Sequence, residues 1–261
     1  MTEKAALTGH PNEFNGKASE YAQYRERYDP DVILPFLREW CGLEAEWSVA
    51  DIGAGTGMVG DMFRTNGNRV IAIEPNTEMR EACAQLHSSD DSFLVADGSA
   101  ESTGLPDAWV EMIAIGRALH WFHVEPAFRE FQRVLKPRGW VTIIACGRDQ
   151  KGREENLALA EFLRPSAQRN AAAESRLGVY QHLSSLFPGG EFHHAEMAGE
   201  MQLDWDGLRG LTLSLSHAPM PDTSGFSAFE TGLRGFFDRY EREGKVTFAT
   251  RAWISAGRFA D

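Results

Sequence analysis

Short apolar runs alternate with helical patterns between residues 47 and 146. The runs carry apolar residues at consecutive positions, which is typical of parallel strands buried on both faces. Five strands are predicted, at Trp47–Ile52, Arg69–Glu74, Ser92–Ala96, Trp109–Ile115 and Trp140–Cys146. Three helices are predicted between them, at Gly57–Thr65, Thr77–His87 and Val124–Leu135. This alternation predicts an α/β fold with a parallel sheet and right-handed crossovers.

Further elements are predicted on both sides of this region. Asp29-Pro30 is a favourable helix start, and the helix should run to about Trp40 and stop at Gly42, with Pro35 bending it or moving its start. Asn66-Gly67 and Pro137-Arg138-Gly139 are turn signals. After Gly147 the pattern predicts helices at 151–185, Leu208–Leu215 and Phe226–Tyr240, and strands at Phe192–Leu203 and Val246–Ile254.

The turn after the first predicted strand is rich in glycine. It reads Asp51-Ile52-Gly53-Ala54-Gly55-Thr56-Gly57 and leads directly into a predicted helix. Glycines let backbone approach a ligand where a Cβ would collide, and the helix start offers unpaired N–H groups. Glu74 ends the second predicted strand, where a carboxylate can meet a ribose hydroxyl. The arrangement predicts an adenosine-type cofactor.

The spacing of the glycines bears on which cofactor is bound. A dinucleotide fingerprint needs Gly-x-Gly-x-x-Gly, but its third glycine would fall at Met58, and the chain has Gly57 instead. This argues against a nicotinamide-dependent oxidoreductase, which stays the first alternative. A tight turn with a purely structural role also produces such a match.

Three segments together resemble the class I S-adenosylmethionine-dependent methyltransferases. Val49–Gly57 is similar to their motif I, Val70–Asn76 to their second-strand motif, and Ala96–Glu101 with Leu105-Pro106 to the segment that binds adenine. The resemblance covers residues 20–147 well. It implies a Rossmann-like, seven-stranded sheet of order 3-2-1-4-5-7-6 with the last strand antiparallel, helices on both faces and a helical cap.

The same resemblance implies roles for individual residues. Glu74 would bind both ribose hydroxyls, Asp97 would accept a hydrogen bond from the adenine amino group, and the amides of Gly98 to Ala100 would meet the ring nitrogens. The glycines would admit the methionine end. The full set of expected cofactor-binding residues is Tyr21, Arg25, Asp51, Gly53, Ala54, Gly55, Gly57, Glu74, Pro75, Asn76, Asp97, Gly98, Ser99, Ala100 and Arg117.

A narrower resemblance lies just after the fourth predicted strand. Gly116–Phe122 is similar to the A-x-H-W-F segment of small-molecule methyltransferases related to the trans-aconitate methyltransferase group, and Tyr21, Tyr24-Arg25 and Tyr28 resemble that group's N-terminal Tyr/Arg motif. Arg117 stands where a Gln is common, and His123 where an Asp is common. These departures bear on the acceptor more than on the cofactor.

Single residues near this segment have both chemical and structural interpretations. His120 could deprotonate or hold an acceptor, or it could be packed beneath a helix start. Arg25 could pair with the cofactor carboxylate or be a solvated surface charge. Trp121 could wall the pocket or face the sulfonium through its ring, or it could be an ordinary core residue. His217 could line an acceptor pocket or only follow the end of a helix.

Composition and charge limit the partners. The chain has 261 residues and a net charge of -12, which disfavours nucleic acid. Three scattered cysteines, no signal peptide and no long apolar stretch predict a cytoplasmic protein that uses no membrane. His120 and His123 lack a third ligand with metal-binding spacing, so no metal is expected. Oligomeric state is open between monomer and homodimer.

The expected organisation is one methyltransferase domain over residues 1–261. Residues 1–40 would form lid helices, 41–147 the cofactor-binding core, 148–240 the cap with the sixth strand, and 241–261 the last strand. The predicted activity is methyl transfer from S-adenosylmethionine to a small molecule by in-line displacement, with a carboxylate or hydroxyl as the favoured acceptor. S-adenosylhomocysteine would be the product. A cofactor-binding module without catalysis is the second alternative.

Overall fold

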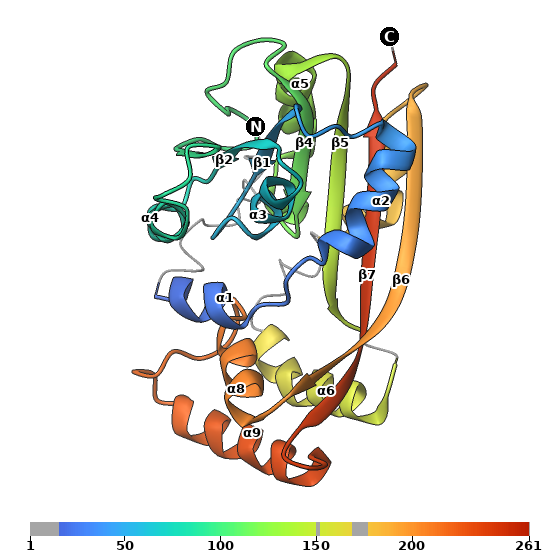
Figure 1. Ribbon diagram of the computed structural model, residues 1–261. Helices are drawn as coiled ribbons and strands as arrows, with labels where there is room; N and C mark the ends of the chain where they lie inside the picture. Colours follow the sequence, from blue (N-terminus) through green and yellow to red (C-terminus); the bar gives the residue numbers. More distant parts are fainter. Residues whose placement is uncertain (1–15, 150–151, 169–176, 261) are drawn as a thin grey trace, which may run out of the picture.

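A seven-stranded sheet runs through the molecule in this computed structural model, which describes residues 16–149, 152–168 and 177–260 (Figure 1). The strand order is β3-β2-β1-β4-β5-β7-β6, and β7 is antiparallel to both of its neighbours. This confirms the expected order and the antiparallel last strand. The strands are β1 (Ser48–Ile52), β2 (Arg69–Ile73), β3 (Phe93–Ala96), β4 (Val110–Gly116), β5 (Leu135–Arg148), β6 (Glu191–Leu203) and β7 (Val246–Arg258).

Helices cover both faces of the sheet. One hydrophobic layer joins the sheet to α2 (Pro30–Cys41), α3 (Met58–Thr65) and α4 (Thr77–Leu86), while the opposite layer joins it to α5 (Val124–Val134) and the 3-10 segment η3 (Leu177–Leu186). The continuous apolar runs thus face a packed layer on each side, as their pattern predicts.

The start and end of α2 follow from its sequence. The Asp29 side chain accepts a hydrogen bond from the Asp31 amide as N-cap, and Gly42 ends the helix with φ of 71°. Pro35 lies inside the helix and neither ends it nor moves its start. Ile33, Leu34 and Leu37 are buried against the sheet, so α2 belongs to the core layers. Residues 1–15 of the expected lid lie outside the described residues.

The cap has a hydrophobic core of its own. It contains α6 (Glu154–Gln168), α8 (Trp205–Leu213) and α9 (Phe226–Tyr240), and it lies at one end of the sheet (Figure 1). Val246 and Phe248, at the start of β7, are fully buried in this third cluster. Helix α1 (Ala18–Tyr24) packs against α8 so closely that a Cβ on Gly210 would lie 2.2 Å from the Tyr24 ring.

Two expectations need correction. The turn predicted at Pro137–Gly139 lies inside β5, where the register to β4 shifts between Val110 and Met112 and Arg138 has φ of 65°. The chain therefore bulges and continues the strand instead of ending it. The helix expected over 151–185 is represented by α6 and η3, and residues 169–176 are outside the described residues.

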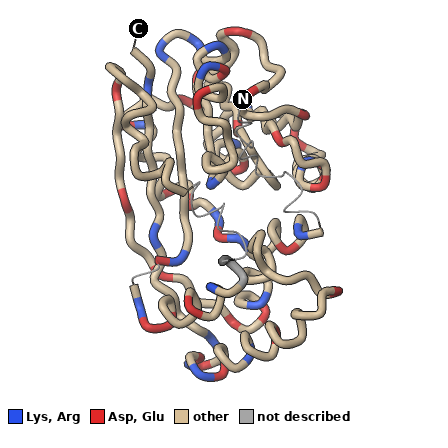
Figure 2. The backbone as a smooth tube through the Cα atoms, turned by 180° about the vertical axis from the view of Figure 1, so that it is seen from behind, with Lys and Arg blue, Asp and Glu red and all other residues tan. Residues whose placement is uncertain are grey.

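Charges and cysteines are spread over the molecule. Basic and acidic positions are interspersed along the backbone (Figure 2). Cys83 is buried and Cys41 and Cys146 are partly buried, and none of the three forms a disulfide. In the described part of the chain, no helix is long and apolar enough to cross a membrane.

Candidate active site

The glycine turn between β1 and α3 has three residues with positive φ. The φ values of Gly53, Gly55 and Gly57 are 67°, 59° and 87°, a region that L side chains rarely adopt. A Cβ on Gly53 would lie 2.8 Å from the Ala118 Cβ, so packing also requires glycine there. A Cβ on Gly55 would meet nothing nearer than a Tyr21 ring carbon at 3.9 Å. Gly55 therefore leaves free space beside the turn.

Glu74 lies immediately after β2 and faces this turn. Its Oε2 accepts a hydrogen bond from the Gly55 amide, and its Oε1 accepts one from the Asn76 amide, both at 2.8 Å. Burial raises the pKa of Glu74, while the two amides and Arg80 oppose that rise. The carboxylate is thus fixed by backbone groups on both of its oxygens.

A cavity of about 300 Å³ opens between the turn, the end of β2 and the segment after β4. Nine of the expected cofactor-binding residues line it: Tyr21, Gly53, Gly55, Glu74, Pro75, Asn76, Ser99, Ala100 and Arg117. Sequence analysis did not assign six further lining residues to the cofactor: Met79, Glu101, Gly116, Ala118, Phe122 and His123. Trp121, expected as a pocket wall or core residue, lines the cavity too.

Six expected cofactor-binding residues are not on the wall of this cavity: Arg25, Asp51, Ala54, Gly57, Asp97 and Gly98. The Asp97 side chain is 76% exposed and forms an ion pair with Arg80 at 3.1 Å. Gly98 has no room for a side chain, because a Cβ there would lie 2.8 Å from an Ile73 methyl carbon. The Ala54 amide donates to the Ile73 carbonyl, which anchors the turn to β2.

Asp51 is buried and stabilises the helix start that follows the glycine turn. It is 1% exposed, and its Oδ2 accepts a hydrogen bond from the Gly60 amide in the first turn of α3 at 2.8 Å. Burial raises the pKa of Asp51 to about 7, the Gly60 amide opposes the rise and the Glu74 charge adds to it. The carboxylate position therefore stabilises the start of α3 rather than facing the cavity.

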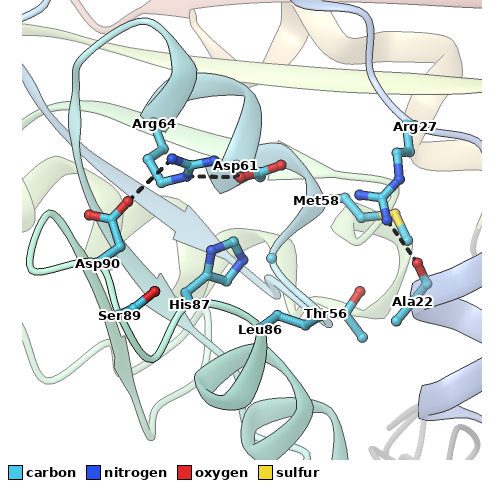
Figure 3. A pocket seen from close by; sticks show the side chains of 11 residues that line it. Ala22, Arg27, Thr56, Met58, Asp61, Arg64, Leu86, His87, Ser89 and Asp90 are labelled. Atoms are coloured by element: carbon cyan, nitrogen blue, oxygen red, sulfur yellow. Dashed lines mark hydrogen bonds and ion pairs between the residues drawn. The ribbon is translucent and has the colours of Figure 1, made fainter.

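A second cavity, of about 260 Å³, lies on the other side of the turn (Figure 3). Thr56 and Gly57 line it together with His87 at the end of α4, and Arg64 bridges Asp61 and Asp90 along its edge. A Cβ on Gly57 would lie 2.8 Å from the Cys83 Sγ. Gly57 is therefore a packing residue at this point, and it does not border the first cavity as expected.

Arg117 connects the first cavity to the chain that follows α1. It has φ of 54°, and its guanidinium forms an ion pair with Glu26 at 3.0 Å and donates to the Cys146 carbonyl. Burial raises the pKa of Tyr21, but the charges of Arg117 and Arg25 outweigh it and hold that pKa below its ordinary value. The Arg25 guanidinium lies 5.0 Å from the centre of the Tyr21 ring.

His120 lies in the short 3-10 helix η2 (Leu119–Trp121) after β4, and it is not on the wall of the first cavity. Its Nδ1 is 3.0 Å from the Tyr180 hydroxyl, and Tyr180 packs edge-on against Trp253. Burial raises the pKa of Tyr180, so its hydroxyl stays protonated. Sequence analysis missed Tyr180, because a lone tyrosine in a helical pattern carries no signal for a partner 60 residues away.

Comparison with known proteins identifies the family of the domain around this site. A model of the methyltransferase domain matches residues 50–143, which run from β1 through most of β5 and include the glycine turn, Glu74 and the segment after β4. Residues 50–143 therefore carry a class I S-adenosylmethionine-dependent methyltransferase domain. A methyltransferase domain of this family implies S-adenosylmethionine as cofactor and S-adenosylhomocysteine as product.

Relatives and solved structures agree with this assignment. An uncharacterized methyltransferase of Mycobacterium tuberculosis is 29% identical over 138 residues, which is 53% of this chain and 54% of that protein. Malonyl-[acyl-carrier protein] O-methyltransferase of Yersinia pestis is 35% identical over 92 residues, 35% of this chain and 33% of that protein. The structure of a candidate type II methyltransferase from Anaeromyxobacter dehalogenans has a TM-score of 0.61 at 17% identity and covers 90% of this chain and 97% of that one.

The family model matches the core of the chain and does not extend into the cap. The chain spans about half the length of the curated relatives it matches. The family match ends within β5, before the cap helices begin. The described residues contain no cluster of three His, Cys, Asp or Glu side chains that could hold a metal ion.

Proposed function

We propose that the protein transfers a methyl group from S-adenosylmethionine to an oxygen atom of a small molecule, a carboxylate or a hydroxyl, by in-line displacement. The observation that carries the proposal is the pairing of Glu74 with Gly55 at a cavity of about 300 Å³. A buried acid can hold the ribose hydroxyls, and an open glycine beside it lets the cofactor come close to the backbone. The Yersinia pestis relative is an O-methyltransferase, which supports an oxygen acceptor.

The residues around the cavity suit the parts of the cofactor. Glu74, with Pro75 and Asn76, would hold the ribose, while Gly53, Ala54 and Gly55 would leave room for the methionine end. Ser99 and Ala100, with Gly98, would face the adenine. Asp97 would reach the adenine amino group only by giving up its ion pair with Arg80. In this proposal Asp51 and Gly57 act by holding the turn in shape.

The methionine end of the cofactor would need a positively charged side chain beside its carboxylate and other side chains that shield it from solvent. Arg25 would pair with the cofactor carboxylate through its guanidinium fork. Tyr21 and Arg117, which line the cavity, would close over the same end. Because Arg117 is tied to Glu26, the chain after α1 and the cavity wall are fixed to each other.

The acceptor chemistry would belong to His120 and its neighbours. When bound, the sulfonium supplies the methyl group that passes to the acceptor oxygen. His120 would take the proton of a hydroxyl acceptor, or hold a carboxylate acceptor, with its ring oriented by Tyr180. Trp121 presents an aromatic ring at the cavity, which would favour a positive charge there.

The proposed location depends on the cysteines and the net charge. We propose a cytoplasmic protein that binds no nucleic acid, because its three cysteines form no disulfide and its net charge is -12. A monomer or a homodimer is proposed.

Calorimetric titration with S-adenosylhomocysteine tests the cofactor site without knowledge of the acceptor. Micromolar binding that is lost in Glu74→Ala is expected, and no binding at millimolar ligand would contradict the proposal. Transfer of labelled methyl from S-adenosylmethionine to a panel of small acids and phenols tests catalysis. Binding without transfer to any of them would favour the non-catalytic module, and a fluorescence change with reduced nicotinamide would favour the oxidoreductase.

A further inference from the structure

The second cavity, of about 260 Å³, shares no lining residue with the first cavity and has no part in the proposed function. It borders the start of α3, because both the N-cap residue Gly57 and the first helical residue Met58 line it. The positive end of the α3 dipole therefore lies at this cavity. A ligand bound there would meet the glycine turn from the side opposite to the cofactor.

Thr56 brings a hydroxyl without a partner to this end of the cavity. The residue is 2% exposed, and its buried Oγ1 makes no hydrogen bond in the described part of the chain. Figure 3 shows this oxygen directed toward the side of the cavity where Arg27 lies. A buried hydroxyl without a partner destabilises a fold, and a ligand in the cavity would satisfy it.

Arg27 supplies a positive charge that no described carboxylate neutralises. Its guanidinium donates to the Ala22 carbonyl at 3.0 Å, and within the described residues it forms no ion pair. Arg27, Thr56 and the start of α3 thus make one end of the cavity positively charged and rich in hydrogen-bond donors. This combination fits a carboxylate, which accepts from a guanidinium and from other donors at once.

Two carboxylates share one guanidinium on the other side of the cavity. Asp61 accepts from Arg64 through Oδ1 at 2.8 Å, and Asp90 accepts from it through Oδ2 at 3.2 Å. Among the residues that the structure describes, the Asp61 Oδ2 has no hydrogen-bond partner. One negative charge is therefore in excess here. Asp61 lies about 6 Å along α3 from Gly57, because it is four residues further on.

The wall between the two ends is uncharged. It includes the exposed Leu86 and the ring of His87, which stacks on Phe93 with 3.7 Å between the ring centres. Burial lowers the pKa of His87, so this ring is neutral near pH 7. The two arginines and two aspartates of the cavity balance one another. The cavity therefore suits a ligand with charged ends, an apolar middle and no net charge.

We infer that the second cavity binds a small zwitterion, an aliphatic ω-amino acid whose carboxylate meets Arg27 and Thr56 and whose ammonium group meets Asp61. The inference goes beyond the proposed methyl transfer and does not depend on it. A ligand with a single charge would leave one end of the cavity unmatched, whereas a zwitterion matches both ends. An α-amino acid carries its two charges too close together for a separation of about 6 Å, so a short carbon chain must lie between them.

Calorimetry on the protein saturated with S-adenosylhomocysteine tests the inference, because the first cavity is then filled. The probe is γ-aminobutyrate. Butyrate and butylamine each lack one of its charges, and glycine holds both charges closer together. We expect γ-aminobutyrate to bind at least about tenfold more tightly than any of these three. If S-adenosylhomocysteine does not bind, the proposed function is contradicted, and the same titration on the free protein still tests the second cavity.

Two variants connect binding with the positive end of the cavity. Thr56→Val removes a buried hydroxyl that has no partner, so the melting temperature should stay the same or rise while the affinity for γ-aminobutyrate falls by about tenfold. Arg27→Gln should lower that affinity by about tenfold or more. Arg129→Gln is the matched control, because Arg129 is in an exposed pair with Glu125 and does not line the cavity. It should leave binding unchanged.

Several results would overturn the inference. It is wrong if γ-aminobutyrate does not bind at tens of millimolar, or if butyrate, butylamine or glycine binds as tightly. It is also wrong if Thr56→Val or Arg27→Gln binds the probe as the unaltered protein does. Displacement of S-adenosylhomocysteine by γ-aminobutyrate would place the probe in the first cavity and would contradict the inference too.

Discussion

Glu74 and Gly55 are joined by a hydrogen bond of 2.8 Å from the Gly55 amide to the Glu74 Oε2. The acid that follows β2 and the open glycine of the turn therefore form one wall of the cavity. Neither residue makes this wall alone, because the carboxylate fixes the turn while the missing side chain of Gly55 leaves the space beside it.

The first prediction concerns Glu74 itself. Glu74→Gln keeps the size of the side chain but loses the charge that would hold two ribose hydroxyls. We expect the affinity for S-adenosylhomocysteine to fall by about ten- to a hundredfold, as for loss of a charged hydrogen bond. Calorimetric titration measures the change. Glu125→Gln, in an exposed pair with Arg129, should bind normally, and equal affinity in all three proteins would remove Glu74 from the site.

The glycines of the turn should separate binding from packing. Gly55→Ala places a methyl group in open space beside the cavity, and Gly57→Ala places one 2.8 Å from the Cys83 Sγ. Both strain a positive φ, at a cost of about 1 kcal/mol or more. We expect Gly55→Ala to lose more affinity and Gly57→Ala to lose more thermal stability. Melting curves and calorimetry on the same samples measure both effects. A larger loss of affinity in Gly57→Ala and a larger loss of stability in Gly55→Ala would contradict the roles given to the two glycines.

Asp51 should make stability depend on pH. Its pKa is raised from 3.8 to about 7, chiefly by burial, so protonation favours the folded state. That contribution is complete below about pH 4 and is lost as the pH rises through about 7, with a limit of about 4 kcal/mol. We therefore expect the free energy of unfolding to fall over this range.

Asp51→Asn tests this dependence, because asparagine can still accept from the Gly60 amide but does not ionise. Urea unfolding followed at several pH values should give a flatter pH profile for this variant. Asp97→Asn alters an exposed carboxylate and serves as the control. An Asp51→Asn profile parallel to that of the unaltered protein would show that Asp51 ionises normally when folded.

The pair of His120 and Tyr180 should affect the methyl-transfer rate. His120→Gln removes the proposed base, for which a loss of about a hundredfold or more in kcat is expected. Tyr180→Phe removes only the hydroxyl that lies 3.0 Å from His120 Nδ1 and should have a smaller effect. Rates with an acceptor from the panel, beside calorimetry with S-adenosylhomocysteine, are the measurement. An unchanged kcat in His120→Gln would show that His120 acts only in packing and not in catalysis.

The contact of α1 with the cap provides a further prediction. Gly210→Ala would place a Cβ 2.2 Å from the Tyr24 ring, whereas Gly235→Ala would meet nothing within 4 Å. Since alanine is favoured over glycine inside a helix by about 0.5–1 kcal/mol, Gly235→Ala should be neutral or stabilising. Gly210→Ala should lower the melting temperature and loosen α1 from α8. Equal melting temperatures for the two variants would show that this contact is not tight.

Much of the fold could be predicted from the sequence because buried parallel strands leave continuous apolar runs. Such a run has one interpretation when a glycine turn and a helix follow it, as after Ile52. The turn prediction at Pro137–Gly139 was wrong. Proline and glycine indicate an irregular backbone, and a bulge within a strand is as compatible with them as a turn is.

The site was only partly predictable, since sequence spacing does not show which side of a turn a residue faces. Gly53, Gly55 and Gly57 alternate along the chain and would share one face of an extended strand, but positive φ at all three curls the backbone. Gly57 then faces Cys83 instead of the cavity. Asp51 and Glu74 are both acids close to strand ends, and only tertiary packing determined which one faces the cavity.

Strands β6 and β7 pass without a break from the sheet into the cap, where Val246 and Phe248 are part of its hydrophobic core. The cap is therefore tied to the sheet through the continuous pairing of β6 with β7. Entry of the acceptor and escape of the methylated product then depend on the other boundary, where α1 and the chain up to Asp29 rest on α8 and β5. We expect product release to be governed by that N-terminal segment.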